Sequence, residues 1–546
     1  MNQFSNPALT TEPNNVSAKD AFDRLTFLGW RWGLAAIVAG LAASFFLFGY
    51  ALIYWRNADM DFMVIYNALA LNAGKPQLFF DHTAYLTILS LKVWYQLLHG
   101  LGLLDAYSLS SFPPASDPAA FDAAMTSAVR AGRLLAFFIA TGCVLIFAAL
   151  ARLMQRDWRV ALIATLAFAF SGGVAVHSRI LRSELVAACP VIFALMLLIV
   201  AGRRAGIARP LALAIAAGLC VLGLENKVQA ILLIGALPLV VLPFGSEKSA
   251  SVAFWSYSQF RWLATGIAAV AAIAAAWAAS PLIATGLNRA LLDAAQFHPL
   301  LLGRFGLYQV ALGILIGACM IAYAMIWRVS TAETLASMFA VAAGTAIALL
   351  VLDLDYSTSN AIAVVNPLEK MLTFADTSTT DAANGSNLWS IFVLLVEGIG
   401  SVLARYTFVL HSSPRPTVLL IWLIVPGIIV AWRRGERLVA VQALALLLAA
   451  IGIDALGVRR GLKSEYFIFT DPLIILSGAV LLDALSDLRF HKWACPIAAT
   501  LFGLHIAVGQ AEPIKYAFMR RGPESICAWN VHYMPLMALP WCPAKP

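Results

Sequence analysis

The chain has 546 residues, of which 61% are hydrophobic and only 12% are charged. A soluble domain carries about a quarter charged residues, so this composition excludes an ordinary soluble protein. The formal net charge is +8, but the lysines and arginines lie in short stretches between apolar segments. That placement is typical of membrane loops and excludes a nucleic-acid partner.

Apolar runs of roughly 20 residues recur along the chain, long enough to cross about 30 Å of hydrocarbon as helices. Backbone amides in lipid must be satisfied within the segment, so these runs predict helices. We expect an all-α polytopic integral membrane protein with about 13 transmembrane helices. The predicted spans are 30–54, 134–150, 160–176, 185–201, 211–224, 228–242, 263–283, 308–327, 335–352, 417–432, 438–456, 467–485 and 494–508.

The basic loops predict the orientation. A cytoplasmic N-terminal tail, residues 1–29 without a cleaved signal sequence, places RLMQRDWR, GRRAGIAR, RRGER and DLRFHKW inside. This arrangement requires that the stretch 391–410, which contains Glu397 and Arg405, lies in the interface or is re-entrant and does not cross. Three segments then lie on the same outer side of the membrane: the loops 57–133 and 353–416 and the tail 511–546. In a bacterial inner membrane this side faces the periplasm.

Two modules are expected between the tails. Residues 30–245 form the first, including the outer loop 57–133, and residues 246–510 form a more variable second one with the outer loop 353–416. Within the first loop, 85–104 is apolar but interrupted by polar residues, which favours a helix lying in the interface plane.

Two cysteines, Cys527 and Cys542, lie in the polar C-terminal tail. On an oxidising outer side they could form a disulfide, with two free thiols as the alternative. The sequence has no CxxC or Cys/His spacing typical of a metal site, and no phosphate-binding loop. We therefore predict neither a metal nor another cofactor.

Two carboxylates, Asp59 and Asp61, follow the first span directly. Acids after a span are often only solvated. Here they open a segment that continues through Tyr66 and His82 into the interfacial helix, at the level of lipid headgroups. A carboxylate held there suits a general base that acts on a hydroxyl group.

The stretch DFMVIYNALALNAG, Asp61 to Gly74, resembles the first outer loop of the GT-C superfamily of membrane glycosyltransferases. The likeness is greatest to glycosyltransferase family 87, and families 39 and 83 are also similar. Three later stretches agree in order: SRILRSELVAACPVIFALMLL, GLCVLGLENKVQAILLI and RRGLKSEYFIFTDPLIILSG. The resemblance is good over about 30–245 and thin afterwards, and it implies a polyprenyl-phosphate-linked sugar as donor.

The resemblance also implies roles for particular residues. Asp61 occupies the position of the catalytic base, with Asp59 as the second candidate. Glu184 would position the acceptor or hold a neighbouring arginine, although an acid at a helix N-terminus is favoured by the helix dipole in any case. His82, Tyr66 and Tyr466 are candidates for contacts around the acceptor, with interfacial structural roles as the alternative.

A leaving group that carries a phosphate needs cations on the same side of the membrane. The predicted topology places six there, each of which could instead interact with lipid headgroups. These candidate phosphate-binding residues are Arg179, Arg182, Lys227, Arg459, Arg460 and Lys463.

Together these residues predict an inverting glycosyltransferase that moves a sugar from a polyprenyl-phosphate donor to a lipid-linked or cell-envelope acceptor. A transporter or lipid flippase is the alternative from another class. Transporters tend to carry inverted repeats and midplane acids, whereas the acids here cluster at span ends. An oligosaccharide ligase, which would use basic and histidine residues of a large outer loop, is a second enzymatic alternative.

Overall fold

The computed structural model describes residues 15–57, 61–77, 84–202, 208–245, 331–359, 388–407, 415–457, 464–485, 494–518, 526–528, 530 and 534–542. Within these ranges the chain is predominantly helical and contains no strand, which confirms the all-α class for the described part. The helices of the first half are α1 (Asn15–Phe45), η1 (Phe46–Tyr50), η2 (Tyr54–Asn57), α2 (Asp61–Asn72), α3 (Tyr85–Gly100), η3 (Leu109–Ser111), α4 (Pro118–Met154), α5 (Trp158–Ala169), α6 (Gly172–His177), α7 (Ser183–Gly202), α8 (Ala208–Asn226), α9 (Ala230–Val241) and η4 (Leu242–Phe244).

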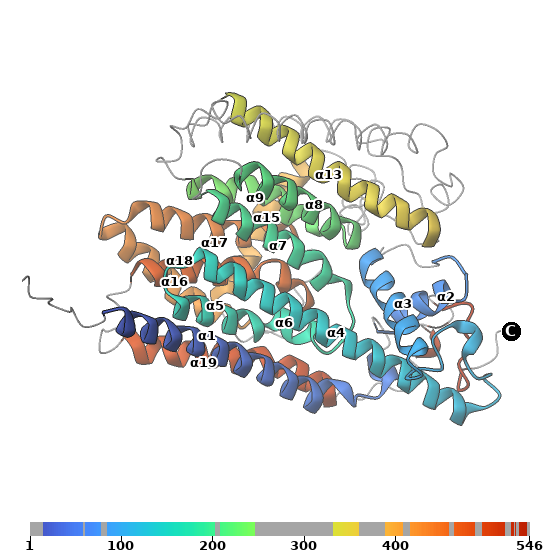
Figure 1. Cartoon of the computed structure of the whole chain (residues 1–546). Helices are drawn as coiled ribbons and strands as arrows, with labels where there is room; N and C mark the ends of the chain where they lie inside the picture. Colours follow the sequence, from blue (N-terminus) through green and yellow to red (C-terminus); the bar gives the residue numbers. More distant parts are fainter. Residues whose placement is uncertain are drawn as a thin grey trace, which may run out of the picture.

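The second half contributes fewer described helices to the same bundle. They are α13 (Thr331–Ser359), α15 (Leu388–Thr407), α16 (Val418–Arg433), α17 (Arg437–Gly457), η8 (Ser464–Phe469), α18 (Asp471–Ala484) and α19 (Ala494–Phe518). The long helices run side by side, whereas α2 and α3 lie beyond one end of the bundle (Figure 1). We call this the α2–α3 end.

Among the described residues, five helices are long and apolar enough to cross a membrane. They cover Leu28–Tyr50, Pro118–Met154, Ser183–Gly202, Ala208–Asn226 and Arg437–Gly457. The chain therefore has the character of a polytopic membrane protein. The count of about thirteen spans stays a prediction, because the predicted spans 263–283 and 308–327 lie outside the described residues.

Two predicted boundaries differ from the structure. Helix α4 begins at Pro118, well before the predicted start of its span at 134, because Asp117 caps its first turn by accepting a hydrogen bond from the Ala120 amide. Its 37 residues extend about 55 Å, more than a bilayer core requires, so α4 continues out of the bundle toward α2. The span predicted at 160–176 is two helices, α5 and α6, separated at Ser171, which caps α6.

Helix α3 covers most of the stretch 85–104, for which the sequence predicts an interfacial helix. Its Tyr85 and Leu91 are buried against neighbouring helices, whereas Val93, Leu97 and Leu101 are more than half exposed. A helix that buries one apolar face in protein and exposes another beside a bundle end is suited to the headgroup region of a bilayer.

The C-terminal tail returns to α2 and α4. The Leu536 amide donates to the Tyr66 hydroxyl, and the Trp541 ring lies 5.9 Å from Tyr54 and 6.2 Å from Phe121, centroid to centroid. The tail and the first loop therefore share one side. An even number of crossings must separate them, a condition that thirteen spans meet and that a fourteenth at 391–410 would break. That stretch forms α15, which packs along α17 with Gly398 against the Ala455 backbone.

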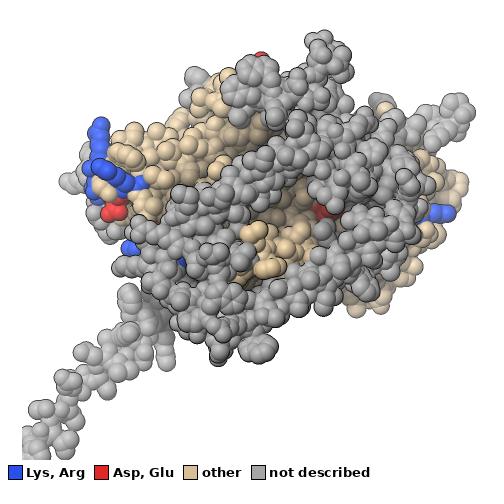
Figure 2. All heavy atoms as spheres, turned by 90° about the horizontal axis from the view of Figure 1, so that it is seen from above, with Lys and Arg blue, Asp and Glu red and all other residues tan. Residues whose placement is uncertain are grey.

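The tail also contains a disulfide between Cys527 and Cys542. Of the two predicted alternatives, the structure therefore has the disulfide and not two free thiols. The opposite end of the bundle carries the exposed basic turn between α16 and α17, with Arg433, Arg434 and Arg437. Figure 2 shows most of the visible lysine and arginine side chains at that end. The orientation of the two ends relative to the membrane stays a prediction.

Candidate functional site

Asp61 is the first residue of α2 and is completely buried. Arg133 of α4 donates through Nε to Oδ2 at 2.9 Å, and the Leu181 amide donates to Oδ1 at 3.0 Å. Arg133 also donates to the Leu52 carbonyl. Burial raises the pKa of Asp61 above its ordinary value, while Arg133 and the Leu181 amide oppose that rise. Both carboxylate oxygens thus have donors, and Asp61 joins α2 to α4 and to the segment before α7.

Glu184, in the first turn of α7, is the centre of a second set of contacts. Its carboxylate lies 2.5 Å from Lys227 Nζ, 3.2 Å from Arg182 Nη2 and 3.5 Å from His177 Nε2. Burial alone would lower the pKa of Arg182, but the carboxylates of Glu184 and Glu465 outweigh it and hold that pKa above its ordinary value. Arg182 therefore stays charged.

The short helix η8 supplies the opposite wall. Glu465 Oε1 forms an ion pair with Arg182 Nη2 at 3.5 Å, and the Tyr466 ring lies under Lys227 Nζ at 5.4 Å from its centroid. Gly173 of α6 permits this approach, because a Cβ atom there would lie 2.7 Å from the Ile468 amide nitrogen. A glycine is thus required at position 173 for η8 to reach its place.

Asn226, a residue not singled out from the sequence, fixes the turn that carries Lys227. Its side chain donates to the Ser183 carbonyl at 2.6 Å and accepts from the Thr87 amide and hydroxyl, both at 3.1 Å. The beginnings of α3 and α7 are thereby fastened to the end of α8. The signal in the sequence was the short polar turn ENK between two apolar runs.

We call the charged residues that these elements bring together the N-terminal charge cluster. It contains three acids and three bases, so its formal charges balance. Its members are Asp61, Arg133, Arg182, Glu184, Lys227 and Glu465. Of the predicted site residues, Asp61, Arg182, Glu184, Lys227 and Tyr466 therefore meet.

Two other predicted residues have contacts elsewhere. Tyr66 binds the C-terminal tail through Leu536. Arg179 is buried against the π-helical turn of α1, where it donates to Ser44, to the Ala175 carbonyl at 2.7 Å and to Gln510 Oε1 at 2.7 Å. All these acceptors are neutral, and burial lowers the pKa of the Arg179 guanidinium to about 10. Five predicted residues lie outside the described ones: Asp59, His82, Arg459, Arg460 and Lys463.

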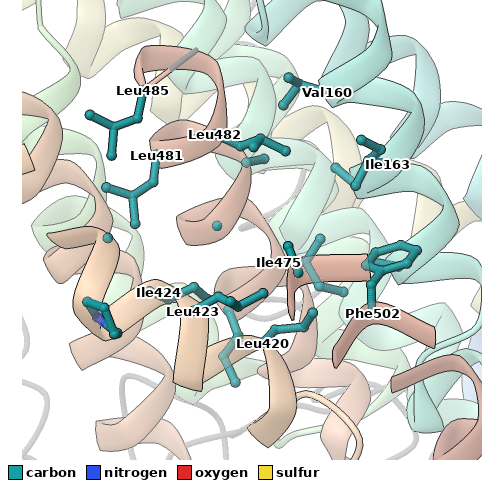
Figure 3. A pocket seen from close by; sticks show the side chains of 18 of the residues that line it. Val160, Ile163, Leu420, Leu423, Ile424, Ile475, Leu481, Leu482, Leu485 and Phe502 are labelled. Atoms are coloured by element: carbon teal, nitrogen blue, oxygen red, sulfur yellow. The ribbon is translucent and has the colours of Figure 1, made fainter. Parts of the chain in front are cut away.

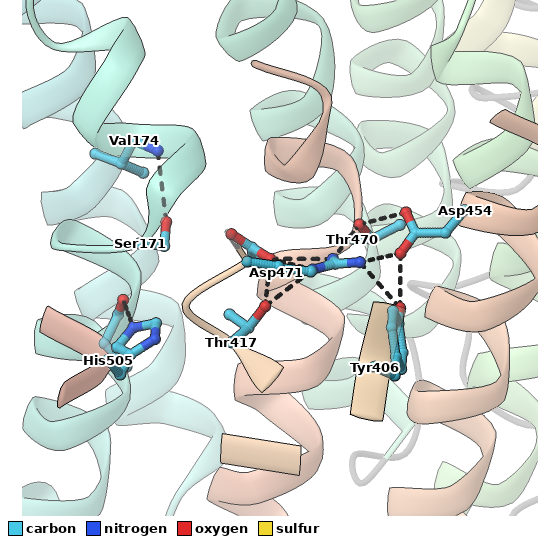
Figure 4. Close-up of polar contacts among 10 residues, drawn as sticks. Ser171, Val174, Tyr406, Thr417, Asp454, Thr470, Asp471 and His505 are labelled. Carbon is cyan, nitrogen blue, oxygen red and sulfur yellow. Dashed lines mark hydrogen bonds and ion pairs between the residues drawn. The ribbon is translucent and has the colours of Figure 1, made fainter. Parts of the chain in front are cut away.

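A second buried cluster was not predicted. Arg415, just before α16, donates through Nε and Nη2 to Asp471 Oδ1 and through Nη1 to Asp454 Oδ2 (Figure 4). Tyr406 donates to Asp454 Oδ2 at 2.6 Å. We call this set the Arg415 cluster: Tyr406, Arg415, Thr417, Asp454, Thr470 and Asp471. The available signal was an aspartate within each of the predicted spans 438–456 and 467–485.

An apolar cavity of about 690 Å³ lies between α5, α16, α18 and α19 (Figure 3). Its wall includes Ile163, Leu420, Ile475 and Phe502, and none of the described residues that line it is charged. An ion or a sugar would find no polar partner on that wall. Among the described residues, no group of three or more His, Cys, Asp or Glu side chains could hold a metal ion.

Comparison with known proteins adds no family to this picture. No protein-family model, no curated protein and no solved structure matches the chain.

Proposed function

We propose that the protein is an inverting membrane glycosyltransferase of GT-C type, which transfers a sugar from a polyprenyl-phosphate donor to a lipid-linked or cell-envelope acceptor. The site is the N-terminal charge cluster, and the proposed orientation places it at the outer face of a bacterial inner membrane. The proposal combines the resemblance of four sequence stretches with the geometry around Glu184.

The observation that carries the proposal is the meeting of those four stretches. Asp61 begins the first and Arg182 and Glu184 lie in the second. Lys227 lies in the third and Tyr466 in the fourth. A hydrogen bond joins the first stretch to the second, an ion pair joins the second to the third, and a cation–π contact joins the third to the fourth. The stretches lie up to about 400 residues apart in sequence, so general membrane composition gives no reason for their meeting.

The proposed reaction has one displacement step. The acceptor hydroxyl gives its proton to Asp61 as its oxygen forms a bond to the anomeric carbon, while the bond from that carbon to the phosphate oxygen breaks. Arg182 and Lys227 stabilise the negative charge that gathers on the departing lipid phosphate. Inversion follows from a single attack on the opposite face.

Asp61 is completely buried, so the residues around its carboxylate must move before an acceptor hydroxyl can reach it. The Leu181 amide is the donor that can change place, because it belongs to the segment 178–182 between α6 and α7. Phosphate binding to Arg182, the next residue, would move that segment and free Oδ1. Donor binding would thereby activate the base.

The test uses purified protein in lipid nanodiscs with a panel of polyprenyl-phosphate sugars and envelope lipids as acceptors. Mass spectrometry measures free polyprenyl phosphate, and NMR gives the anomeric configuration of the product. We expect release in the wild type and a loss of at least about tenfold in Lys227→Met, with the exposed Lys515→Met as control. Absence of release from every donor, or equal release from both variants, would contradict the proposal.

Transport is the second candidate function, and the Arg415 cluster is the observation that favours it, because buried charges inside a helical bundle often mark ion pathways. The discriminating measurement is flux across sealed proteoliposomes. Accumulation of a lipid-linked sugar inside, without cleavage of its phosphate bond, would favour a transporter over the transferase.

A further inference from the structure

His177, the last residue of α6, is a buried histidine at the edge of the N-terminal charge cluster, and the proposed reaction does not use it. Its Nδ1 lies 2.6 Å from the Gly173 carbonyl oxygen. Because a carbonyl oxygen can only accept, Nδ1 carries a hydrogen in the neutral and in the charged ring. The other ring nitrogen, Nε2, is therefore the atom that gains or loses a proton.

Nε2 of His177 faces Glu184. It lies 3.5 Å from Oε2 of that carboxylate, and it makes no hydrogen bond with any described residue. In the neutral ring Nε2 presents a lone pair to the carboxylate oxygen, so two acceptors oppose each other. In the protonated ring the same contact is an ion pair. One proton thus makes the contact favourable, and neither side chain has to move.

Glu184 depends on two partners that a phosphate would also bind. Lys227 Nζ lies 2.5 Å and Arg182 Nη2 lies 3.2 Å from Oε1, and Arg182 Nε donates to Oε2 at 3.3 Å. An anionic ligand that takes these two cations leaves a completely buried carboxylate in need of another positive partner. His177 is already within ion-pair distance and can supply that charge by taking a proton from water.

The described groups of η8 at this site cannot supply a positive charge. Glu465 is an acid that is itself paired with Arg182. The Tyr466 ring lies under Lys227 and has only a phenol group to titrate. Neither side chain becomes a cation at any pH.

Basic groups on the other elements that pack against α6 have partners of their own. Arg133 of α4 is paired with Asp61, and Arg179 donates to neutral acceptors around α1 and α19. His505 of α19 contacts a backbone carbonyl of α5. Arg159 lies in the first turn of α5, at the end of that helix away from α6. Among the described side chains, the histidine that contacts the charge cluster is therefore the one at the end of α6.

We propose that His177 takes up one proton when the phosphate group of an isoprenyl lipid enters the N-terminal charge cluster, and then holds Glu184 while Arg182 and Lys227 bind the phosphate. A histidine is suited to this exchange, because its side chain changes charge near neutral pH. The inference rests on the proposed function, in which the same phosphate belongs to the sugar donor. His177 touches no reacting atom and is a positioning residue.

The test is isothermal titration calorimetry of the full chain in phosphatidylcholine nanodiscs at pH 6 and pH 8. The probe is geranyl methyl phosphate, a phosphodiester whose own charge does not change in this range. Each titration is repeated in two buffers of different ionisation enthalpy, which gives the number of protons taken up per bound probe. For the wild type we expect an uptake of about 0.5–1 proton at pH 8 and binding at least about fivefold weaker there than at pH 6, because protons are scarcer.

His177→Gln keeps an amide group near Glu184 but cannot gain a charge. Its affinity for the probe should be the same at both pH values, and its proton uptake should be absent. His99→Gln changes an exposed histidine of α3, so this control should behave as the wild type.

Equal proton uptake in the wild type and His177→Gln would overturn the inference, as would wild-type binding without proton uptake, and both results leave the proposed function intact. A wild type that does not bind the probe would overturn the inference together with the proposed site. Competition by phosphatidylglycerol as strong as by the probe itself would overturn the assignment to an isoprenyl phosphate. If His177→Gln does not fold, nitrogen NMR of histidine-labelled wild type at pH 8 decides. A new imidazolium signal on probe binding supports the inference, and its absence overturns it.

Discussion

The two buried charge clusters are built from the same residue types but differ in balance. The N-terminal charge cluster sets three bases against three acids, and Glu184 alone contacts Lys227, Arg182 and His177. In the described part of the chain, the Arg415 cluster sets one guanidinium against two carboxylates, and no described residue donates to Oδ2 of Asp471. The first cluster can therefore receive an anionic ligand by exchange of partners, whereas the described part of the second has two carboxylates that share one guanidinium.

The two clusters are also joined by one short helix. Glu465 and Tyr466 at the start of η8 contact the first cluster, and Thr470 and Asp471, which follow its end, belong to the second. η8 is a short 3-10 helix with a rise of about 2 Å per residue, so a displacement of one end also moves the other end. The Arg415 cluster therefore positions the wall of the proposed active site.

The largest expected effect comes from removing the guanidinium of Arg415 from the Arg415 cluster. Arg415→Met leaves Asp454 and Asp471 buried without a positive partner, so we expect a loss of about 3–5 kcal/mol in unfolding free energy. Denaturant titration in mild detergent measures it. Arg437→Met, an exposed arginine over the Trp432 ring, is the control and should change stability by less than about 1 kcal/mol. Equal losses in both variants would contradict a structural role for Arg415.

An intermediate effect is expected where η8 meets α6. Gly173→Ala introduces a Cβ atom 2.7 Å from the Ile468 amide nitrogen, so η8 must move, at a cost of about 1–3 kcal/mol. Transfer should fall together with stability, because Glu465 and Tyr466 move away from Arg182 and Lys227. Gly142→Ala, with no atom within 4 Å of the new Cβ, is the matched control. Unchanged sugar transfer in Gly173→Ala would show that η8 is not part of the active site.

The smallest effect is expected at the tail. The disulfide Cys527–Cys542 closes a loop with a sequence separation of 15, for which the loop-entropy estimate is at most about 3 kcal/mol. The double variant Cys527→Ser/Cys542→Ser should release the tail from Tyr66 and Tyr54 while the bundle stays folded. Limited proteolysis should then cut the tail at least about tenfold faster, with the melting temperature nearly unchanged. A cooperative loss of the whole fold would contradict this separation.

Much of this organisation follows from local sequence signals. The apolar runs indicate helices, the ENK turn and the acid at Glu184 mark helix ends, and Asp61 begins α2 as a residue favoured at a helix N-terminus. The meeting of Asp61, Glu184, Lys227 and Tyr466 was anticipated because the resemblance named their stretches and the predicted topology placed them on one side.

The remainder depends on tertiary contacts that no local pattern encodes. Arg133 lies in α4 just before the predicted start of that span, which was placed 16 residues too late, so its pairing with Asp61 was missed. Asp454 and Asp471 read as isolated acids within apolar runs until packing brings Arg415 between them. The break at Ser171 has a local signal in Ser171, Gly172 and Gly173, which was overlooked because apolar residues lie on both sides of it.

The most direct test of the proposed activity compares Asp61→Asn with the double variant Asp61→Asn/Arg133→Met. The single variant leaves Arg133 buried without its carboxylate, and the double variant removes both charges, so the double variant should regain stability. Release of polyprenyl phosphate is measured for both, alongside Asp59→Asn. The account predicts that transfer falls at least about 100-fold in both Asp61 variants, including the stable double variant. Transfer restored together with stability in the double variant would show that Asp61 is a structural partner of Arg133 and not the base.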